Sequence, residues 1–196
     1  MTIQIRSLEP KDALDFVEFF DHMDFKHAEH WRGCYCQFYH LKSSGEPWTK
    51  TRGEKAREMA LINIARGYTR GYLALDGERI VAWCHVNDQA KLPRLTDFIQ
   101  TYLPEGRTAV VACFMVHPDY RQQGIASRLL DAAIEGSRAE GFAALMGLPS
   151  APNPIPARQY HGKSELYLKA GFTKLAEADG QEIFLLTFLL EKLGRP

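Results

Sequence analysis

The apolar positions of this chain change between a strand pattern and a helix pattern, most clearly near its middle. Residues 109–116 are apolar on both faces, which is typical of a central strand covered on both sides. Because proline cannot continue a strand ladder, we expect this strand to end at His117-Pro118-Asp119. A helix is then predicted from apolar residues spaced i, i+3, i+4, i+7 and i+8, namely Ala126, Leu129, Leu130, Ala133 and Ile134.

Apolar spacing and turn residues predict the other elements. We expect helices at residues 10–20, 54–66, 95–102 and 163–170, and strands at residues 3–6, 72–75, 80–86, 142–148, 172–176 and 182–190. Asp76-Gly77 and Asp179-Gly180 predict hairpins, because both residue types tolerate positive φ. The strand at 142–148 should follow a right-handed crossover and run parallel to 109–116, and the prolines of 149–156 predict an extended loop. The fold class is therefore α/β, a mixed sheet with helices on both faces.

Composition and charge exclude several classes of protein. The 196 residues are 45% hydrophobic and carry 24 Lys and Arg against 24 Asp and Glu. A packed fold is expected, without the overall field that collects nucleic acid or anionic membranes. The longest apolar runs fall well short of the roughly 18 residues that indicate a membrane helix. The chain begins without an export signal and its four cysteines are interpreted as reduced, so we expect a cytoplasmic protein.

No repeat, low-complexity segment or shift in composition marks a linker between domains. We therefore expect residues 1–196 to form one domain. Within it, residues 21–67 are irregular and partly helical, and they are rich in His, Trp, Cys and Tyr as far as residue 53.

The turn at residues 121–127 carries the most specific chemistry. A tight connection from a buried strand to a helix leaves backbone N–H groups unpaired and aimed at one point, and the helix dipole adds positive potential there. Gly124 allows close approach of a ligand to the backbone, and Arg121 adds a permanent charge, so the turn is predicted to hold a phosphate. The alternative is an ordinary strand-to-helix turn in which the glycine serves only the backbone.

The segment Arg121-Gln-Gln-Gly124-Ile-Ala126 resembles the acetyl-CoA-binding motif of the GNAT-type N-acetyltransferases: Arg or Gln, two residues, Gly, one residue, then Gly or Ala. The order of predicted elements fits that family over nearly the whole chain. The resemblance implies acetyl-CoA as cosubstrate and a mostly antiparallel sheet whose two parallel central strands splay apart. The residues implied to bind the cosubstrate are Phe114, Val116, Arg121, Gln122, Gln123, Gly124, Ile125, Ala126 and Ser127.

The segment Tyr167-Leu-Lys-Ala-Gly171-Phe172 is similar to a second signature of that family, and this resemblance implies a catalytic tyrosine. In that role Tyr167 faces the thioester sulfur and protonates it as a general acid. A phenol of pKa about 10 facing a thiol of about 8.5 makes the transfer uphill by roughly 2 kcal/mol, which is small beside a typical barrier. The alternative is that Tyr167 only packs its helix against the sheet. A backbone N–H near Phe114 or Met115 could hold the developing oxyanion.

The sequence does not assign the general base. Some family members carry a Glu on the central strand, whereas residues 109–116 contain no carboxylate. His85, His117 and His161 lie near predicted strand ends or a helix start and could act directly or through water, but each could equally be an ordinary surface or packed histidine.

Residues 31–40 combine aromatic and sulfur side chains where this family usually builds its acceptor pocket. Cys34, Cys36 and His40, with Cys84 as an additional candidate, could imitate zinc ligands, but Cys-x-Cys is too short for the usual knuckle and no metal is expected. A buried aromatic and thiol cluster is the favoured interpretation. Tyr160-His161-Gly162 could contact acceptor or CoA, or anchor its loop.

These observations predict an enzyme that transfers an acetyl group from acetyl-CoA to a primary amine by direct attack in a ternary complex. The acceptor is left open between a small molecule and a peptide, and a homodimer is one of the arrangements left open. The main alternative is a non-catalytic acyl-CoA-binding module or sensor, which the missing strand carboxylate favours. A thiol or metal sensor built on Cys34 and Cys36 is a weaker alternative.

Overall fold

A seven-stranded mixed sheet organises the chain, in the order β1-β2-β3-β4-β5-β7-β6. The computed structural model describes residues 2–26, 28–150 and 156–188. Only the central pair, β4 and β5, is parallel, which confirms the predicted mixed and mostly antiparallel sheet. The strands are β1 Ile3–Ser7, β2 Gly71–Asp76, β3 Arg79–Asp88, β4 Thr108–Val116, β5 Ala144–Gly147, β6 Thr173–Ala178 and β7 Gln181–Thr187.

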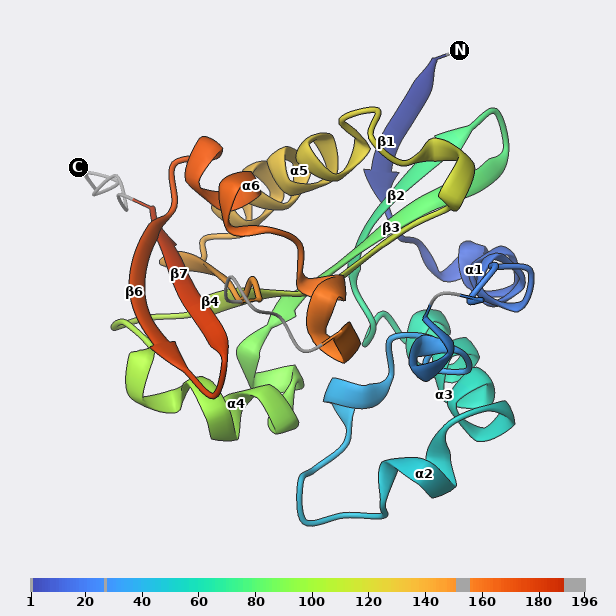
Figure 1. Cartoon of the computed structure of the whole chain (residues 1–196), viewed down its shortest axis with the longest axis horizontal. Coiled ribbons are helices and arrows are strands. Elements are labelled where there is room, and N and C mark those ends of the chain that lie inside the picture. The colour runs from blue at the N-terminus through green and yellow to red at the C-terminus, as the bar shows by residue number, and fades with distance from the viewer. Residues whose placement is uncertain (1, 27, 151–155, 189–196) are drawn as a thin grey trace, which may run out of the picture.

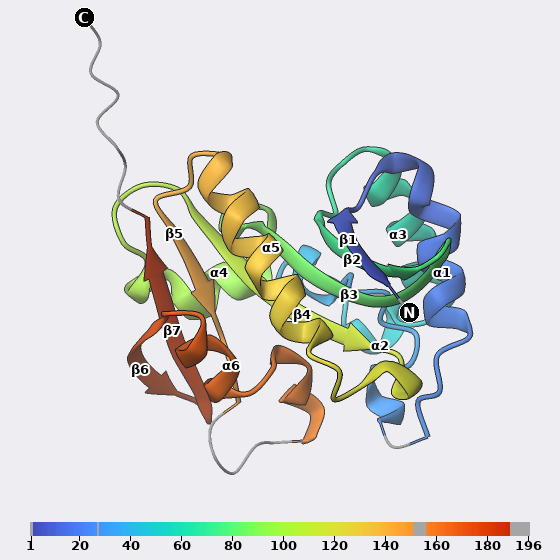
Figure 2. The ribbon, with the colours of Figure 1, turned by 90° about the horizontal axis from the view of Figure 1, so that it is seen from above.

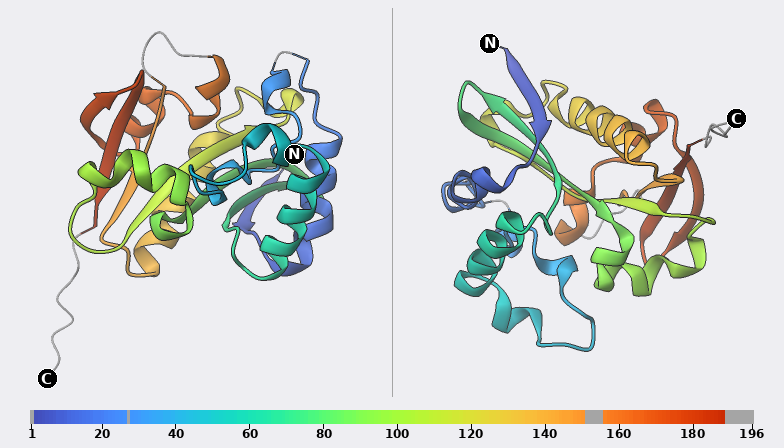
Figure 3. Two further views of the ribbon diagram at one scale, coloured as in Figure 1. Left: turned by 90° about the horizontal axis from the view of Figure 1, so that it is seen from below. Right: turned by 180° about the vertical axis from the view of Figure 1, so that it is seen from behind.

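Helices cover both faces of this sheet (Figure 1). They are α1 Ala13–Asp21, α2 Trp48–Thr51, α3 Glu54–Ala65, α4 Pro93–Ile99, α5 Ile125–Ala139 and α6 Ser164–Lys169. The long helix α5 crosses one face over the central strands (Figure 2), while α3 and α4 lie on the other face, as the reverse view in Figure 3 also shows. No helix in the described parts of the chain is long and apolar enough to span a membrane.

The core confirms the two elements that the apolar pattern predicted most strongly. Every residue of β4 except Val116 is buried, as expected for a strand covered on both faces. Leu129, Leu130 and Ala133 of α5 are fully buried against the sheet. Burial of three such side chains contributes several kcal/mol at roughly 25 cal/mol per Å² of apolar surface.

An irregularity in the pairing of β3 with β4 decides which face each later residue of β4 occupies. His85 pairs with Cys113 and Val86 with Val111, so Ala112 is an extra residue on β4. Beyond this bulge Phe114 packs into the cluster under α5, whereas Cys113 and Met115 pack on the opposite face. The end of β4 therefore presents side chains to two separate surroundings.

The parallel strands β4 and β5 part halfway along β4. Their pairing ends at Val111 and Gly147, and the chain after β5 turns to β7 instead. There Gln181 Nε2 donates to the carbonyl of Leu148 at 2.6 Å. The N–H of Glu182 donates to the carbonyl of Pro149 at 2.9 Å. Within the described parts of the chain, residues 112–116 consequently have no strand on their β5 side, and the predicted splay is confirmed.

Several boundaries differ from the sequence-based predictions. Helix α4 begins at Pro93, whose fixed φ suits a first turn, and ends at Ile99 before a 3₁₀ turn. The predicted extended loop at 149–156 overlaps a 3₁₀ helix, η7, at Pro156–His161. Residues 151–155 of that loop and residues 189–190 of the last predicted strand lie outside the described residues.

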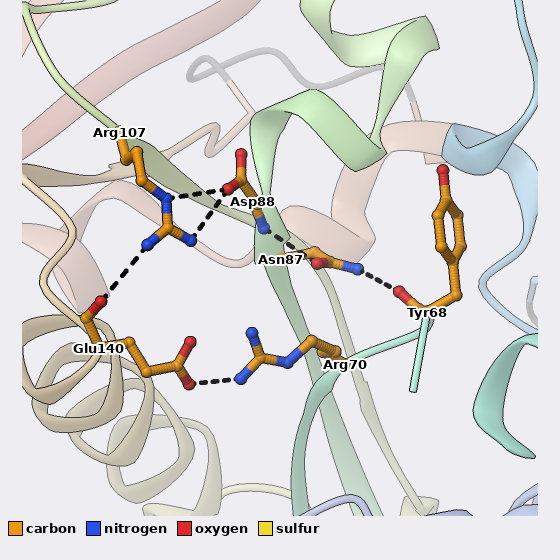
Figure 4. Close-up of polar contacts among 6 residues, drawn as sticks. All are labelled: Tyr68, Arg70, Asn87, Asp88, Arg107 and Glu140. Carbon is orange, nitrogen blue, oxygen red and sulfur yellow. Dashed lines mark hydrogen bonds and ion pairs between the residues drawn. The ribbon is translucent and has the colours of Figure 1, made fainter. Parts of the chain in front are cut away.

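A polar network holds the C-terminal end of α5 (Figure 4). Arg107 Nη2 donates to Asp88 Oδ2 at 3.1 Å, and its Nη1 donates to the carbonyl of Glu140 at 3.4 Å. The Glu140 carboxylate in turn pairs with Arg70. These contacts join the helix to the ends of β3 and β4, so α5 is anchored at the end remote from the turn that precedes it.

Candidate active site

The turn before α5 presents a row of unpaired backbone donors. Gly124 caps the helix in a left-handed conformation, with φ 74°, and Gln122 also has a positive φ of 60°. Within the described parts of the chain, the backbone N–H groups of residues 122–127 have no hydrogen-bond acceptor. The dipole of the 15-residue helix behind these donors adds positive potential at the turn, an arrangement that favours an anion.

Gly124 leaves the space in front of these donors open. A Cβ built on this residue would meet no atom of the described chain within 4 Å, so the glycine is not needed for packing. Arg121 lies beside it and donates from Nε to the carbonyl of Val116 at 3.2 Å. The guanidinium therefore adds its positive charge where the turn meets the end of β4.

A cavity of about 760 Å³ runs from this turn along the unpaired edge of β4 to η7 and α6. All the residues predicted to bind the cosubstrate line it except Gln123, whose side chain donates to the carbonyl of Asp119 at 3.0 Å. The structure thus brings Phe114 and Val116 into one cavity with the turn.

A second cavity, of about 440 Å³, lies on the other face of the sheet. Residues 31–40, predicted for the acceptor pocket, supply Trp31, Cys34, Cys36, Phe38 and Tyr39 to its wall. Trp31, Met115 and Tyr160 line both cavities, so the two cavities meet beside Met115 at the end of β4.

Tyr167 lies at the point where β4 and β5 part. A Cβ on Gly147 would come within 2.2 Å of its ring, so the glycine makes room for the tyrosine. The hydroxyl donates to the carbonyl of His161 at 2.7 Å, and the side chain is fully buried and lines neither cavity. Burial raises the pKa of Tyr167 well above its ordinary value, so the phenol is protonated.

A chain of hydrogen bonds starts at the junction of the two cavities. The hydroxyls of Tyr160 and Tyr39 are 2.6 Å apart, and the Tyr39 hydroxyl is 3.0 Å from His161 Nε2. Burial raises the pKa of both tyrosines, which are therefore neutral. Tyr39 and Tyr160 are 121 residues apart in sequence, so no local pattern could have indicated this contact.

The three histidines considered as bases are not brought together. His85 lines the second cavity, stacked between Trp83 and His40, and burial lowers the pKa of its imidazole well below the ordinary value. His161 belongs to the hydroxyl chain. His117 lines neither cavity and contacts Asp119 and Arg79 at the end of β4.

The cysteines of residues 31–40 line the second cavity as neutral thiols. Burial raises the pKa of Cys34 to about 12 and that of Cys36 well above the ordinary value. In the described part of the chain, no group of three His, Cys, Asp or Glu side chains is arranged to hold a metal ion.

Known proteins share this fold. The family model described as the acetyltransferase (GNAT) family matches residues 25–164. The PaiA N-acetyltransferase of Thermoplasma acidophilum, solved with coenzyme A, superposes with a TM-score of 0.58 at 16% identity, over 96% of this chain and 100% of that one. YncA of Salmonella typhimurium, a putative acetyltransferase solved with acetyl-CoA, gives a TM-score of 0.58 at 16% identity, over 100% of this chain and 98% of that one.

A polyamine N-acetyltransferase of Drosophila melanogaster that forms N-acetylagmatine gives a TM-score of 0.55 at 14% identity, over 95% of this chain and 100% of that one. At these identities the likeness shows the fold. No curated protein matched the chain.

Replacing Gly124 by Leu should abolish binding of CoA, because the new side chain fills the space in front of the turn amides. Losing charge-assisted hydrogen bonds of about 1.5–3 kcal/mol each corresponds to a loss in affinity of more than about 100-fold by calorimetry. Gly141→Leu is the matched control, since Gly141 has the same φ of 74° and equally open space at the other end of α5. Equal CoA affinity in the two variants would contradict the phosphate site.

Proposed function

This chain belongs to the GNAT acetyltransferase family, and we propose that it acetylates a primary amine with acetyl-CoA by direct attack in a ternary complex. The observation that carries this proposal is the meeting of two cavities beside Met115 at the end of β4, one with an anion site and the other with aromatic walls. A direct transfer needs thioester and amine to approach each other from separate sites.

The cavity beside α5 suits acetyl-CoA. Its turn offers unpaired N–H groups and Arg121 to the pyrophosphate, and Gly124 leaves room for it. The unpaired edge of residues 112–116 offers backbone groups to the amides of the pantetheine arm. A chain placed along this edge brings the thioester toward Met115, where the second cavity begins.

In this proposal Tyr167 is the general acid that protonates the departing thiolate. Its raised pKa keeps the phenol protonated at neutral pH, and it also makes proton transfer to the sulfur more uphill than it would be for an ordinary phenol. The hydroxyl donates to the His161 carbonyl here, so it must exchange this acceptor for the sulfur when the cosubstrate is bound.

The hydroxyl chain is the proposed route for the proton of the acceptor ammonium. An amine of pKa about 10 is almost wholly protonated at pH 7 and cannot attack until it loses a proton. With His161 in the Nδ1–H tautomer, Tyr160 accepts this proton, passes its own to Tyr39, and Tyr39 passes its own to His161 Nε2. The acceptor nitrogen loses two protons in all as the ammonium becomes an amide. One leaves by this route before the attack, and the other replaces the proton that Tyr167 gives to the thiolate.

Release of free CoA thiol tests the function. We expect turnover with at least one member of a panel of primary amines, amino acids and peptides, together with mass-spectrometric detection of the N-acetyl product. If calorimetry shows CoA binding and no amine supports release, the chain is an acyl-CoA-binding module and the catalytic proposal is wrong.

Tyr167→Phe should lower kcat by about 100-fold or more, the usual effect of removing a general acid. The affinity for CoA should change little, because the turn amides and Arg121, which are proposed to hold its pyrophosphate, are unchanged. Stopped-flow thiol release and calorimetry on the same preparation measure both quantities. An unchanged kcat would refute the acid role.

Tyr39→Phe interrupts the proton route, since it removes a hydroxyl with two hydrogen-bonding partners. We expect kcat/KM at pH 7 to fall by about tenfold or more. The deficit should shrink as the pH approaches the pKa of the amine, where neutral amine is already present. Tyr102→Phe, a partly buried tyrosine beside α4, is the control. A deficit that stays constant with pH would indicate a structural role only.

A further inference from the structure

Arg94 is the unusual residue of the second cavity, which is the proposed acceptor site, because it is a permanent positive charge in a mostly apolar wall. The wall includes the rings of Phe20, Trp31, Phe38, Tyr39, Trp48, Phe98 and Tyr160. Arg94 lies in the first turn of α4 and contributes the one side chain in this lining that is charged at every physiological pH and positive. A mostly apolar cavity with one cationic side chain among its described lining residues can orient an anionic ligand group.

The guanidinium of Arg94 is held in place but incompletely satisfied. Its Nη2 donates to the carbonyl of Lys42 at 3.2 Å, and its central carbon lies 4.4 Å from the centre of the Phe38 ring. The Nε–H is buried and has no hydrogen-bond partner. Among the described residues no carboxylate lies within ion-pair distance of Arg94.

Other arginines of the chain show how the same group is usually satisfied. Arg6 forms a two-pronged contact with Asp12 at 2.6 and 2.7 Å, and Arg107 donates to Asp88 from both Nε and Nη2. Such planar forks suit carboxylates, which accept from two N–H groups at once. Arg94 has no carboxylate partner among the described residues, and it lines a cavity large enough for a small ligand.

We propose that the acceptor is an apolar amino carboxylate, a primary amine whose carboxylate pairs with Arg94 while its hydrocarbon or aromatic body fills the ring-lined cavity. This inference rests on the proposed acetyl transfer and names its substrate class. The amine lies beside Trp31, Met115 and Tyr160, where the two cavities meet. The carboxylate pairs with the Arg94 guanidinium where that group lines the cavity, and the aromatic walls receive the apolar body.

The same charge acts against polyamines. A second ammonium group inside this cavity would face the Arg94 guanidinium at low dielectric, where like charges repel strongly. Asp179, on the β6–β7 turn, is the one carboxylate in the lining and already has an interaction of its own. His30 and His85 also line the cavity, and burial lowers the pKa of His85, so that ring is neutral near pH 7.

Matched pairs of amines test the proposal on the unaltered protein. L-Phenylalanine is compared with 2-phenylethylamine, and 6-aminohexanoate with hexylamine. The members of each pair differ in the presence of one carboxylate. The carboxylate lies close to the nitrogen in the first pair and far from it in the second. In at least one pair we expect kcat/KM to favour the carboxylate by about tenfold or more, as for one charge-assisted hydrogen bond. Equal or better use of the carboxylate-free amine in both pairs overturns the proposal.

Variants of Arg94 identify the residue responsible. In Arg94→Gln the ratio of kcat/KM within the favoured pair should collapse to about one, and Arg94→Lys should retain part of it because the charge remains while the fork is lost. Arg66→Gln, at the exposed end of α3, is the control and should keep the full ratio. A ratio that survives Arg94→Gln overturns the assignment. Absence of turnover with every amine, with CoA still bound, would instead overturn the proposed acetyl transfer.

Discussion

The parting of β4 from β5 is the constraint on which the rest of the site depends. Pairing that ended at Val116 instead of Val111 would fill the edge of residues 112–116 with ladder hydrogen bonds and close the cavity beside it. The separation is maintained from both sides. Gln181 and Glu182 draw the chain after β5 toward β7, and the ring of Tyr167 stands against Gly147 where a longer side chain would be.

The bulge at Ala112 decides which side chains at the end of β4 line each of the two cavities. Without the extra residue, regular alternation after Val111 would reverse the sides of Cys113, Phe114 and Met115 relative to the sheet. With it, Phe114 lines the cavity beside α5 and Cys113 lines the second cavity, while Met115 borders both. The overall charge of zero is no obstacle to binding a polyanion, because the turn before α5 concentrates donors, dipole and guanidinium locally.

Features that depend on neighbouring residues were predictable from sequence, and features that depend on distant contacts were not. The apolar run of β4, the spacing of α5 and the glycine turn between them are local, and the structure contains all three. The bulge is set by the partner strand β3, and the contact of Tyr39 with Tyr160 joins segments that meet only in the folded chain. Arg94 was overlooked for the same reason, since a lone arginine before an apolar helix is unremarkable until Phe38 and Lys42 are placed around it.

His161 is held at two points by two different tyrosines. Its backbone carbonyl accepts from Tyr167 and its ring nitrogen contacts the Tyr39 hydroxyl. One residue therefore links the tyrosine beside the central strands to the wall of the second cavity. Groups that share a partner do not contribute independently to stability or rate. The two tyrosines are therefore energetically coupled, and the free-energy cost of losing both differs from the sum of the separate losses.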